Sequence, residues 1–176
     1  MAQQPYRGNS SSGPGGGRGG SSQQSTMRQL PNPQTILYFI NGQPSTDLVD
    51  REAENLGRAL AVEDGLKPTQ LRRYYDDIQT LRTRLDALTQ ELSKSHGEEK
   101  QARAAAFERL RADFKMLKAK AAYAHGRKLI PERLLTFFIN HVHSVRNAED
   151  FEVFFKHFQA VLAFHRFYKP NDGNSD

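Results

Sequence analysis

The chain has 176 residues, no cysteine and a formal net charge of +5 at neutral pH. At roughly 100 to 200 residues per domain, this length accommodates one domain and a tail. The lack of cysteine excludes disulfides and thiol catalysis, and it agrees with a reducing cytoplasm. Because the sequence has no apolar run of about eighteen residues and no ordered series of signal-peptide regions, we expect a cytoplasmic protein without a membrane span.

The N-terminal segment differs in composition from the rest of the chain. Residues 1–34 contain no Asp or Glu and are rich in Gly, Ser, Gln and Pro. Such a segment buries too little apolar surface to offset the entropy lost on folding. We therefore expect a disordered glycine-rich tail over 1–34, a helical domain over 35–170 and a disordered C-terminus over 171–176.

The tail contains one arginine-glycine-glycine triplet and one further arginine-glycine pair. The triplet is Arg18-Gly19-Gly20 and the pair is Arg7-Gly8. Segments of this kind assist binding to single-stranded nucleic acid in other proteins. One triplet is weak evidence for that role, so a flexible linker is the preferred interpretation.

Positive charge is concentrated in the middle of the chain. Residues 1–34 carry +3, residues 35–66 carry −4, residues 67–130 carry +7 and residues 131–176 carry −1. The basic middle segment favours a polyanionic partner. The commoner explanation of a charge run is a solvated helix face, so both interpretations stay open at this point.

Two short elements are expected before the main helices. Residues 36–40 form an apolar run closed by Asn41, Gly42 and Pro44, which indicates a brief extended or helical piece and then a turn. The pattern does not decide between strand and helix. From Asp47 onward, acidic side chains suited to a positive helix N-terminus predict a first helix that ends near Gly65.

Two long helices have the clearest periodicity. In the second helix, which starts at Pro68 and breaks at 95–97, apolar residues alternate at steps of three and four: Leu71, Tyr74, Ile78, Leu81, Leu85, Leu88 and Leu92. The third helix repeats this rhythm with Phe107, Leu110, Phe114, Leu117, Ala121 and Ala124. Gly126 is placed to end it with a left-handed cap. Helices with narrow apolar stripes and a short connection are expected to pack antiparallel.

The last two helices are more apolar than the preceding pair. The fourth begins at Pro131, and its broader apolar stripe indicates deeper burial. Asn147 is suited to cap the fifth helix, which Lys169 and Pro170 end. Together these patterns predict an all-α fold, a five-helix bundle.

The fifth helix is apolar on more than one face, so it has to be surrounded by its own bundle or by another chain. A central core helix and a partial subunit contact are both compatible with the sequence. The predicted subunit-contact residues are Phe155, Phe164, Phe167 and Tyr168.

The sequence offers no catalytic or metal site. No nucleophile motif, phosphate-binding loop or zinc-ligand spacing is present. His141 and His143 are two residues apart, a spacing that directs side chains to different sides of a helix. His157 and His165 are eight apart and share a face, but they form no His/Cys cluster. We therefore expect a protein that is not an enzyme and that uses no metal or cofactor.

The second helix begins with candidate phosphate-binding residues. Arg72 and Arg73 lie in its first turns, where free backbone N–H groups and guanidinium groups both bind phosphate. The neighbouring Asp76 and Asp77 are interpreted as surface ion partners of these arginines, not as a catalytic acid and base.

The third helix supplies the remaining candidates. Spacings of four and three place three cations in one row opposite the apolar stripe, namely Arg111, Lys115 and Lys118. Three further cations continue the charge past the helix end, namely Lys120, Arg127 and Lys128. Such rows bind the nucleic-acid backbone, so we expect RNA contacts that depend on salt and not on base sequence.

Three blocks of the chain resemble the small subunit of the type III-A (Csm) CRISPR effector. The first, Thr69 to Tyr75, resembles a T-x-Q-L-R-aromatic motif, and the second, Leu117 to Arg127, is similar to a K-x-A-Y-A-x-G-R signature. The third, Phe158 to Tyr168, looks like the family's C-terminal block, although that block usually has a carboxylate near the place of Gln159 and a tyrosine at that of Phe164. The resemblance extends over about residues 66–169.

This resemblance implies a non-catalytic helical bundle that stacks in several copies into a short filament. Its expected partners are guide RNA and target RNA backbone, the large subunit and the guide-binding backbone subunits. By motif position, the implied RNA-facing residues are Arg72, Arg73, Lys118, Lys120 and Arg127. Alternatively, Tyr123, Ala124 and Gly126 of the second block serve only helix packing and capping.

Two other functions are compatible with parts of the pattern. The seams of the second and third helices favour a coiled-coil adaptor or scaffold without nucleic-acid binding. A helix-turn-helix DNA-binding regulator is disfavoured, since no short capped recognition helix follows a tight turn.

Overall fold

The computed structural model describes residue 1, residues 29–96 and residues 98–169. A small hairpin precedes the helices, with strands β1 (Phe39–Ile40) and β2 (Gln43–Pro44). The helices are α1 (Arg51–Arg58), which continues into the π-helical turn η1 (Ala59–Glu63), α2 (Pro68–His96), α3 (Glu99–Gly126), α4 (Glu132–Ser144) and α5 (Ala148–Tyr168). The predicted all-α, five-helix class is confirmed. Most of the predicted N-terminal tail and the predicted disordered C-terminus lie outside the described residues.

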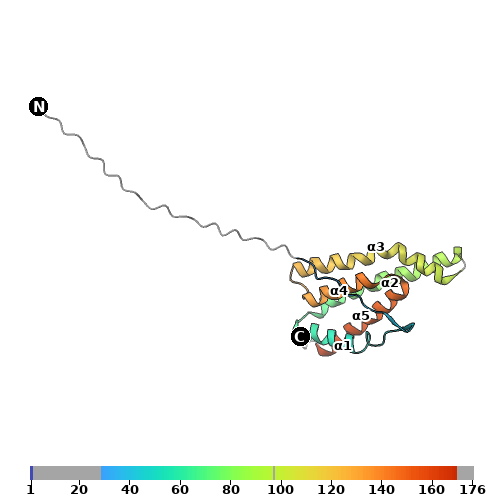
Figure 1. Cartoon of the computed structure of the whole chain (residues 1–176), viewed down its shortest axis with the longest axis horizontal. Coiled ribbons are helices and arrows are strands. Elements are labelled where there is room, and N and C mark those ends of the chain that lie inside the picture. Colours follow the sequence, from blue (N-terminus) through green and yellow to red (C-terminus); the bar gives the residue numbers. More distant parts are fainter. Residues whose placement is uncertain (2–28, 97, 170–176) are drawn as a thin grey trace, which may run out of the picture.

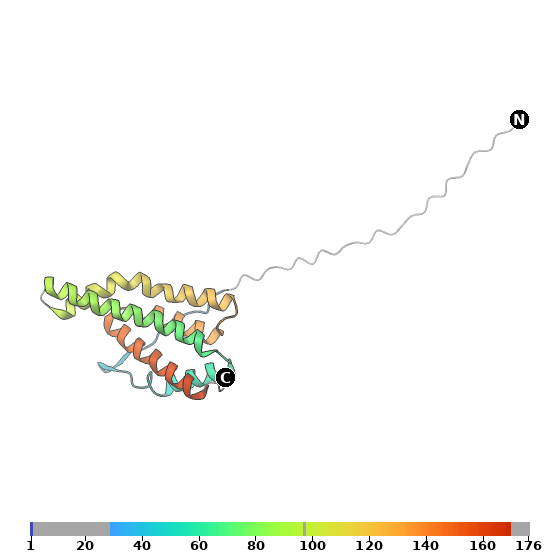
Figure 2. The same cartoon turned by 180° about the vertical axis from the view of Figure 1, so that it is seen from behind.

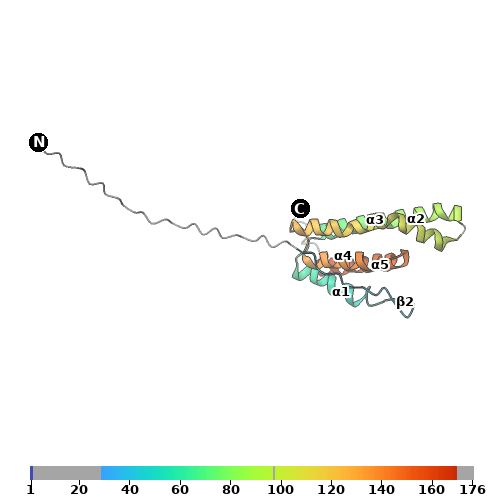
Figure 3. The same cartoon turned by 45° about the horizontal axis from the view of Figure 1, so that its top comes forward.

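The helices are arranged in layers (Figures 1 and 3). The antiparallel pair α2 and α3 forms one layer, α4 and α5 lie beneath it, and α1 with the β hairpin lies on the side away from α2 and α3. The hairpin formed by α2 and α3 extends past the other helices at the end where α2 leads into α3 (Figure 2). The opposite end of this hairpin therefore lies close to the ends of α1, α4 and α5.

The predicted apolar seam joins α2 to α3. The seam residues of α2 are buried except Leu88, which is partly buried, and those of α3 from Phe107 to Ala121 are buried. Two ion pairs follow the same antiparallel register on the solvent side: Lys120 Nζ lies 2.9 Å from Asp77 Oδ2, and Arg84 Nη1 lies 2.7 Å from Asp113 Oδ2. This register fixes which side chains of α2 neighbour which side chains of α3.

The phenylalanines of α5 form the centre of the core. Phe154 and Phe158 are fully buried, and Phe151 is 2% exposed. The Phe114 ring of α3 makes edge-to-face contacts with Phe151 and Phe154, with ring centroids 5.7 and 5.6 Å apart. Edge-to-face packing is favourable because the positive ring edge meets the negative ring face. The structure therefore supports the core-helix interpretation of α5.

The β hairpin settles the ambiguity over residues 36–40. Phe39 pairs with Pro44 and Ile40 with Gln43 in an antiparallel register. Asn41 and Gly42 both have positive φ, at 52° and 76°. Positive φ at both central residues is the requirement of a type I′ turn, which favours an Asn-Gly sequence. Residues 39 and 40 thus form a strand that ends in a tight turn, whereas residues 36–38 belong to neither a strand nor a helix.

Helix boundaries agree with the capping signals at most positions. The Asn147 side chain accepts a 2.7 Å hydrogen bond from the Asp150 backbone N–H, which confirms the predicted cap of α5. Two boundaries were predicted wrongly. The first helix begins at Arg51 and not at Asp47. The left-handed residue after α3 is Lys128, with φ 59°, because Gly126 still belongs to the helix.

Gly57 permits α1 and α5 to cross closely. A Cβ at this position would lie 2.7 Å from Phe164 Cβ, 2.8 Å from the His165 backbone N and 2.9 Å from the Val161 carbonyl O. Two of these three atoms belong to the α5 backbone and cannot rotate away. The close approach of the two helices therefore depends on the missing side chain.

Two histidines are buried in the core without full hydrogen bonding. His141 Nδ1 lies 2.6 Å from Tyr38 Oη. Burial raises the pKa of Tyr38, so the phenol stays protonated in its hydrogen bond with this nitrogen. His141 Nε2 and both ring nitrogens of His157 have no partner among the described residues, and the two rings lie 5.0 Å apart. Burial therefore lowers the pKa of His157 to about 4 and that of His141 well below its usual value.

We predict that Gly57→Ala destabilises the fold by about 1 to 3 kcal/mol, the usual range for overpacking. Urea unfolding followed by circular dichroism measures this change. The control is Gly126→Ala, where no atom lies within 4 Å of an added Cβ. The control is expected to be neutral or slightly stabilising, since alanine favours helix. Equal stability of the two variants would contradict the close crossing.

We also predict loss of stability in mild acid. Histidine has an unfolded pKa near 6.5, so between that pH and about 4 the unfolded chain binds protons that buried His157 excludes. The free energy of unfolding should fall as the pH drops through this window, by about 3 kcal/mol from His157 alone.

Urea midpoints at pH 7.5, 6 and 5 measure this dependence. His157→Leu should weaken it, and His141 and His165, whose pKa burial also lowers, should account for the part that remains. A wild-type midpoint independent of pH would contradict the prediction.

Candidate nucleic-acid interface

The structure divides the predicted cations between the two flanks of α3. Arg111, Lys115 and Lys118 face α4, where they line a groove together with residues of α4 and of segment 30–33. Lys120 faces α2, because it pairs with Asp77. The division follows from helical geometry, since positions 118 and 120 differ by about 200° around the helix axis.

The groove facing α4 has a volume of about 500 Å³. Lys115 and Lys118 are exposed and make no ion pair with the described part of the chain. Arg111 differs from them, since its guanidinium lies 2.9 Å from Glu108 Oε1 and donates to the Arg146 carbonyl. Arg111 therefore anchors the end of α4, whereas the two lysines stay available to an external anion.

Arg146 and His143 also line this groove, and sequence reasoning missed both. Each is exposed and lies at or just after the C-terminal end of α4. Helical spacing along α3 gives no indication of them because they come from another element. For Arg146 the available signal was its position, since a basic side chain near a helix C-terminus lies next to unsatisfied carbonyl groups.

A second cationic group lies on the flank facing α2. The register of the ion pairs places Arg73 of α2 beside Ala124, between Lys120 and Arg127 of α3. Arg73 is exposed and has no ion pair within the described residues. Arg127 donates a 3.0 Å hydrogen bond to the Tyr123 hydroxyl, not to a carboxylate. Of these three cations, only Lys120 is paired with an acid.

The remaining two candidates lie apart from these groups. Arg72 pairs with Asp76 at 2.9 Å, and its guanidinium carbon lies 5.3 Å from the centroid of the Tyr75 ring. It lines a groove of about 710 Å³ between α2 and α5. Lys128 lines a larger groove, of about 870 Å³, where α3 turns into α4. The interpretation of Asp76 and Asp77 as ion partners is confirmed, although Asp77 pairs with Lys120.

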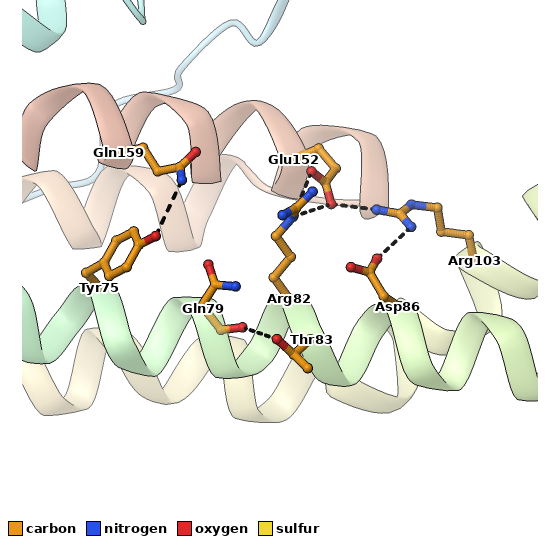
Figure 4. A network of polar contacts seen from close by, with 8 residues as sticks. All are labelled: Tyr75, Gln79, Arg82, Thr83, Asp86, Arg103, Glu152 and Gln159. Carbon is orange, nitrogen blue, oxygen red and sulfur yellow. Dashed lines mark hydrogen bonds and ion pairs between the residues drawn. The ribbon is translucent and has the colours of Figure 1, made fainter. Parts of the chain in front are cut away.

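A polar network between α2, α3 and α5 binds two further arginines (Figure 4). Glu152 of α5 accepts from Arg82 and from Arg103, and Arg103 also pairs with Asp86 at 3.1 Å. Arg82 covers the Phe155 ring at 4.8 Å. These arginines hold the layers together. At the other end of the network, the Gln159 amide donates to the Tyr75 hydroxyl at 3.5 Å.

The four predicted subunit-contact residues differ widely in exposure. Phe155 is 3% exposed and packs inside the chain, so its ring offers no surface to a partner. Phe164 is partly buried against Gly57, and Tyr168 donates a hydrogen bond to Glu54. Phe167 alone among the four projects into solvent, with 74% of its surface exposed.

The histidines do not gather into a metal site. Within the described ranges, no group of three or more His, Cys, Asp or Glu side chains is placed to hold a metal ion. His157 packs beside His141, whereas His165 Nε2 lies 3.1 Å from the Leu66 carbonyl.

None of the described helices has the length and apolarity to span a lipid bilayer.

Comparison with known proteins identifies the family. The family model described as Csm2 Type III-A matches residues 43–171, which is most of the chain and nearly all of the helical bundle. No curated protein and no solved structure matches the chain. The matched range includes all five helices and all eight candidate cations. The chain therefore belongs to the Csm2 family, the small subunit of the type III-A CRISPR effector complex.

Proposed function

We propose that this subunit is non-catalytic and that it binds the backbone of target RNA, or of the guide–target duplex, without reading base sequence. The observation that supports this most directly is the pair Lys115 and Lys118, both exposed and without ion pairs in the described structure. They flank a groove that Arg146 and His143 also line. Membership of the Csm2 family implies association with the other Csm subunits, which would bring this surface to RNA.

The chemistry of the groove favours phosphate over base edges. Lysine and arginine bind phosphate oxygens by charge and by hydrogen bonds, and such contacts position a protein without specifying sequence. Among the residues that line the groove there is no Asn or Gln side chain suited to paired contacts with adenine, and Arg111, one of its two arginines, is already held by Glu108 and the Arg146 carbonyl. Binding should therefore depend on counterion release.

The cations that face α2 extend this surface. Lys120 is paired with Asp77, but both side chains are about half exposed. An exposed pair of this kind is worth about 0 to 1 kcal/mol, so exchanging the carboxylate for a phosphate costs little. Arg73 and Arg127 need no such exchange. The α2–α3 layer thus presents cations on both flanks of α3.

Self-association of several copies into a short filament is the second part of the proposal. Phe167 supports it, since its ring, 74% exposed near the end of α5, would be stabilised by burial against a second copy. Phe155 takes no part, because its ring is covered by Arg82 and Tyr75. We propose that the subunit works in the cytoplasm. Its proposed neighbours are the guide RNA, the large subunit and the guide-binding backbone subunits.

We predict that wild-type protein binds RNA weakly, with log affinity falling linearly as log salt rises and with no preference among sequences. Lys115→Glu with Lys118→Glu should lower affinity at least tenfold and reduce the salt slope by about 1 to 2. Filter binding at several salt concentrations measures both. The matched control is Lys156→Glu, at an exposed position on α5.

If the protein is instead an adaptor without nucleic-acid binding, the wild type and the lysine variant should give the same result in this assay, with no salt-dependent RNA binding by either. Selective binding of one sequence, or affinity independent of salt, would also contradict the proposed function.

We predict that Phe167→Asp lowers self-association or assembly with the other subunits while helix content is retained. The ring is largely solvated, so its loss removes partner contacts and not core packing. Sedimentation and circular dichroism measure the two quantities. Leu37→Asp is the control, because Leu37 is also well exposed, at 69%, but lies next to the β hairpin. Unchanged assembly of the Phe167 variant would contradict the proposed contact.

A further inference from the structure

Tyr123 is an exposed aromatic residue among the cations of α3. Its side chain is 66% exposed, so the packing role considered from the sequence is not what the structure shows. A tyrosine ring exposed to this degree loses hydrophobic stabilisation that burial would provide. The cationic surface proposed above does not account for this ring, since phosphate binding requires no aromatic group.

The helical neighbours of Tyr123 leave the ring open and surround it with charge. On an α-helix, the side chains three and four positions away are the ones that cover a residue. For Tyr123 two of these are small, Ala119 and Gly126, and two are cationic, Lys120 and Arg127. The small neighbours cannot cover the ring. The surface on either side of it is therefore positively charged.

Arg127 fixes the position of the ring. Its Nη1 donates to the Tyr123 hydroxyl at 3.0 Å, and its guanidinium carbon lies 5.7 Å from the ring centroid. This contact restrains the side chain before any ligand binds, which lowers the entropy cost of binding. Arg73, placed by the α2–α3 register beside Ala124, adds a cation on the next helix.

We propose that Tyr123 is a stacking site for an unpaired base of RNA, with Lys120, Arg127 and Arg73 holding the adjacent phosphates. An open aromatic ring in a cationic surface is the arrangement that binds single-stranded nucleic acid without sequence preference. Stacking on an aromatic side chain accepts every base, because every base has a π face. The site rests on the proposed RNA-binding function and adds a preference for unpaired over paired nucleotides.

The test uses the full-length chain and a short RNA that contains 2-aminopurine, whose fluorescence changes when the base stacks on an aromatic ring. The same sequence as a blunt duplex is the second ligand. Tyr123→Phe keeps the ring, Tyr123→Ala removes it, and Leu37→Ala removes an exposed apolar side chain next to the β hairpin as the control. Circular dichroism establishes that each variant is folded.

The expected result is a fluorescence change with wild type, Tyr123→Phe and Leu37→Ala that disappears with Tyr123→Ala. Affinity of Tyr123→Ala for the single strand should fall about fivefold or more, with the salt slope unchanged and duplex affinity nearly unchanged. If Tyr123→Ala binds the single strand as tightly as the wild type does, and the wild type causes no fluorescence change, the stacking proposal is overturned and the phosphate-binding proposal stands. Failure of the wild type to bind either RNA would overturn both proposals.

Discussion

The contact of Phe114 with Phe151 and Phe154 joins the α2–α3 layer to the rest of the bundle. Together with the seam to α2 and the packing against α4, it sets how α3 is rotated about its own axis, because the buried stripe of α3 has to meet all three helices. Once that rotation is set, helical geometry directs Lys115 and Lys118 toward α4 and Lys120 toward α2. The two cationic flanks, and the open position of Tyr123, follow from this core contact.

The cations of the bundle belong to two classes that a charge count does not separate. Arg82, Arg103 and Arg111 bind carboxylates or a carbonyl group of neighbouring segments, and they contribute to holding those segments in place. Lys115 and Lys118 have no such partner within the described chain. Both classes add equally to the net charge. The proposed affinity for RNA should depend mainly on Lys115 and Lys118, because their charges are not bound within the chain.

The sequence predicted the helices well because their signals are local. The heptad seam of α2 and α3 and the Asn147 cap depend on residues within a few turns of each other, and the structure places them as expected. Contacts between distant segments give no such local signal. Burial of Phe155 depends on Arg82 and Tyr75 of α2, more than seventy positions earlier in the chain.

The candidate site shows the same limit. Spacing along α3 predicted a row of Arg111, Lys115 and Lys118, and all three do line one groove. Spacing did not predict the ion pair between Arg111 and Glu108, because Glu108 is only one of several acidic side chains with which Arg111 could have paired. Nor did it predict Arg146, which reaches the groove only because α4 packs on α3.

In the proposed function, the α4-facing flank of α3 lies against RNA in the assembled effector. Lysine footprinting by amine acetylation and mass spectrometry tests it directly, on the whole complex with and without bound target RNA. The account predicts that RNA protects Lys115 and Lys118, while Lys94 and Lys156, exposed elsewhere on the bundle, stay equally reactive. Equal modification of Lys115 and Lys118 in both states would contradict it.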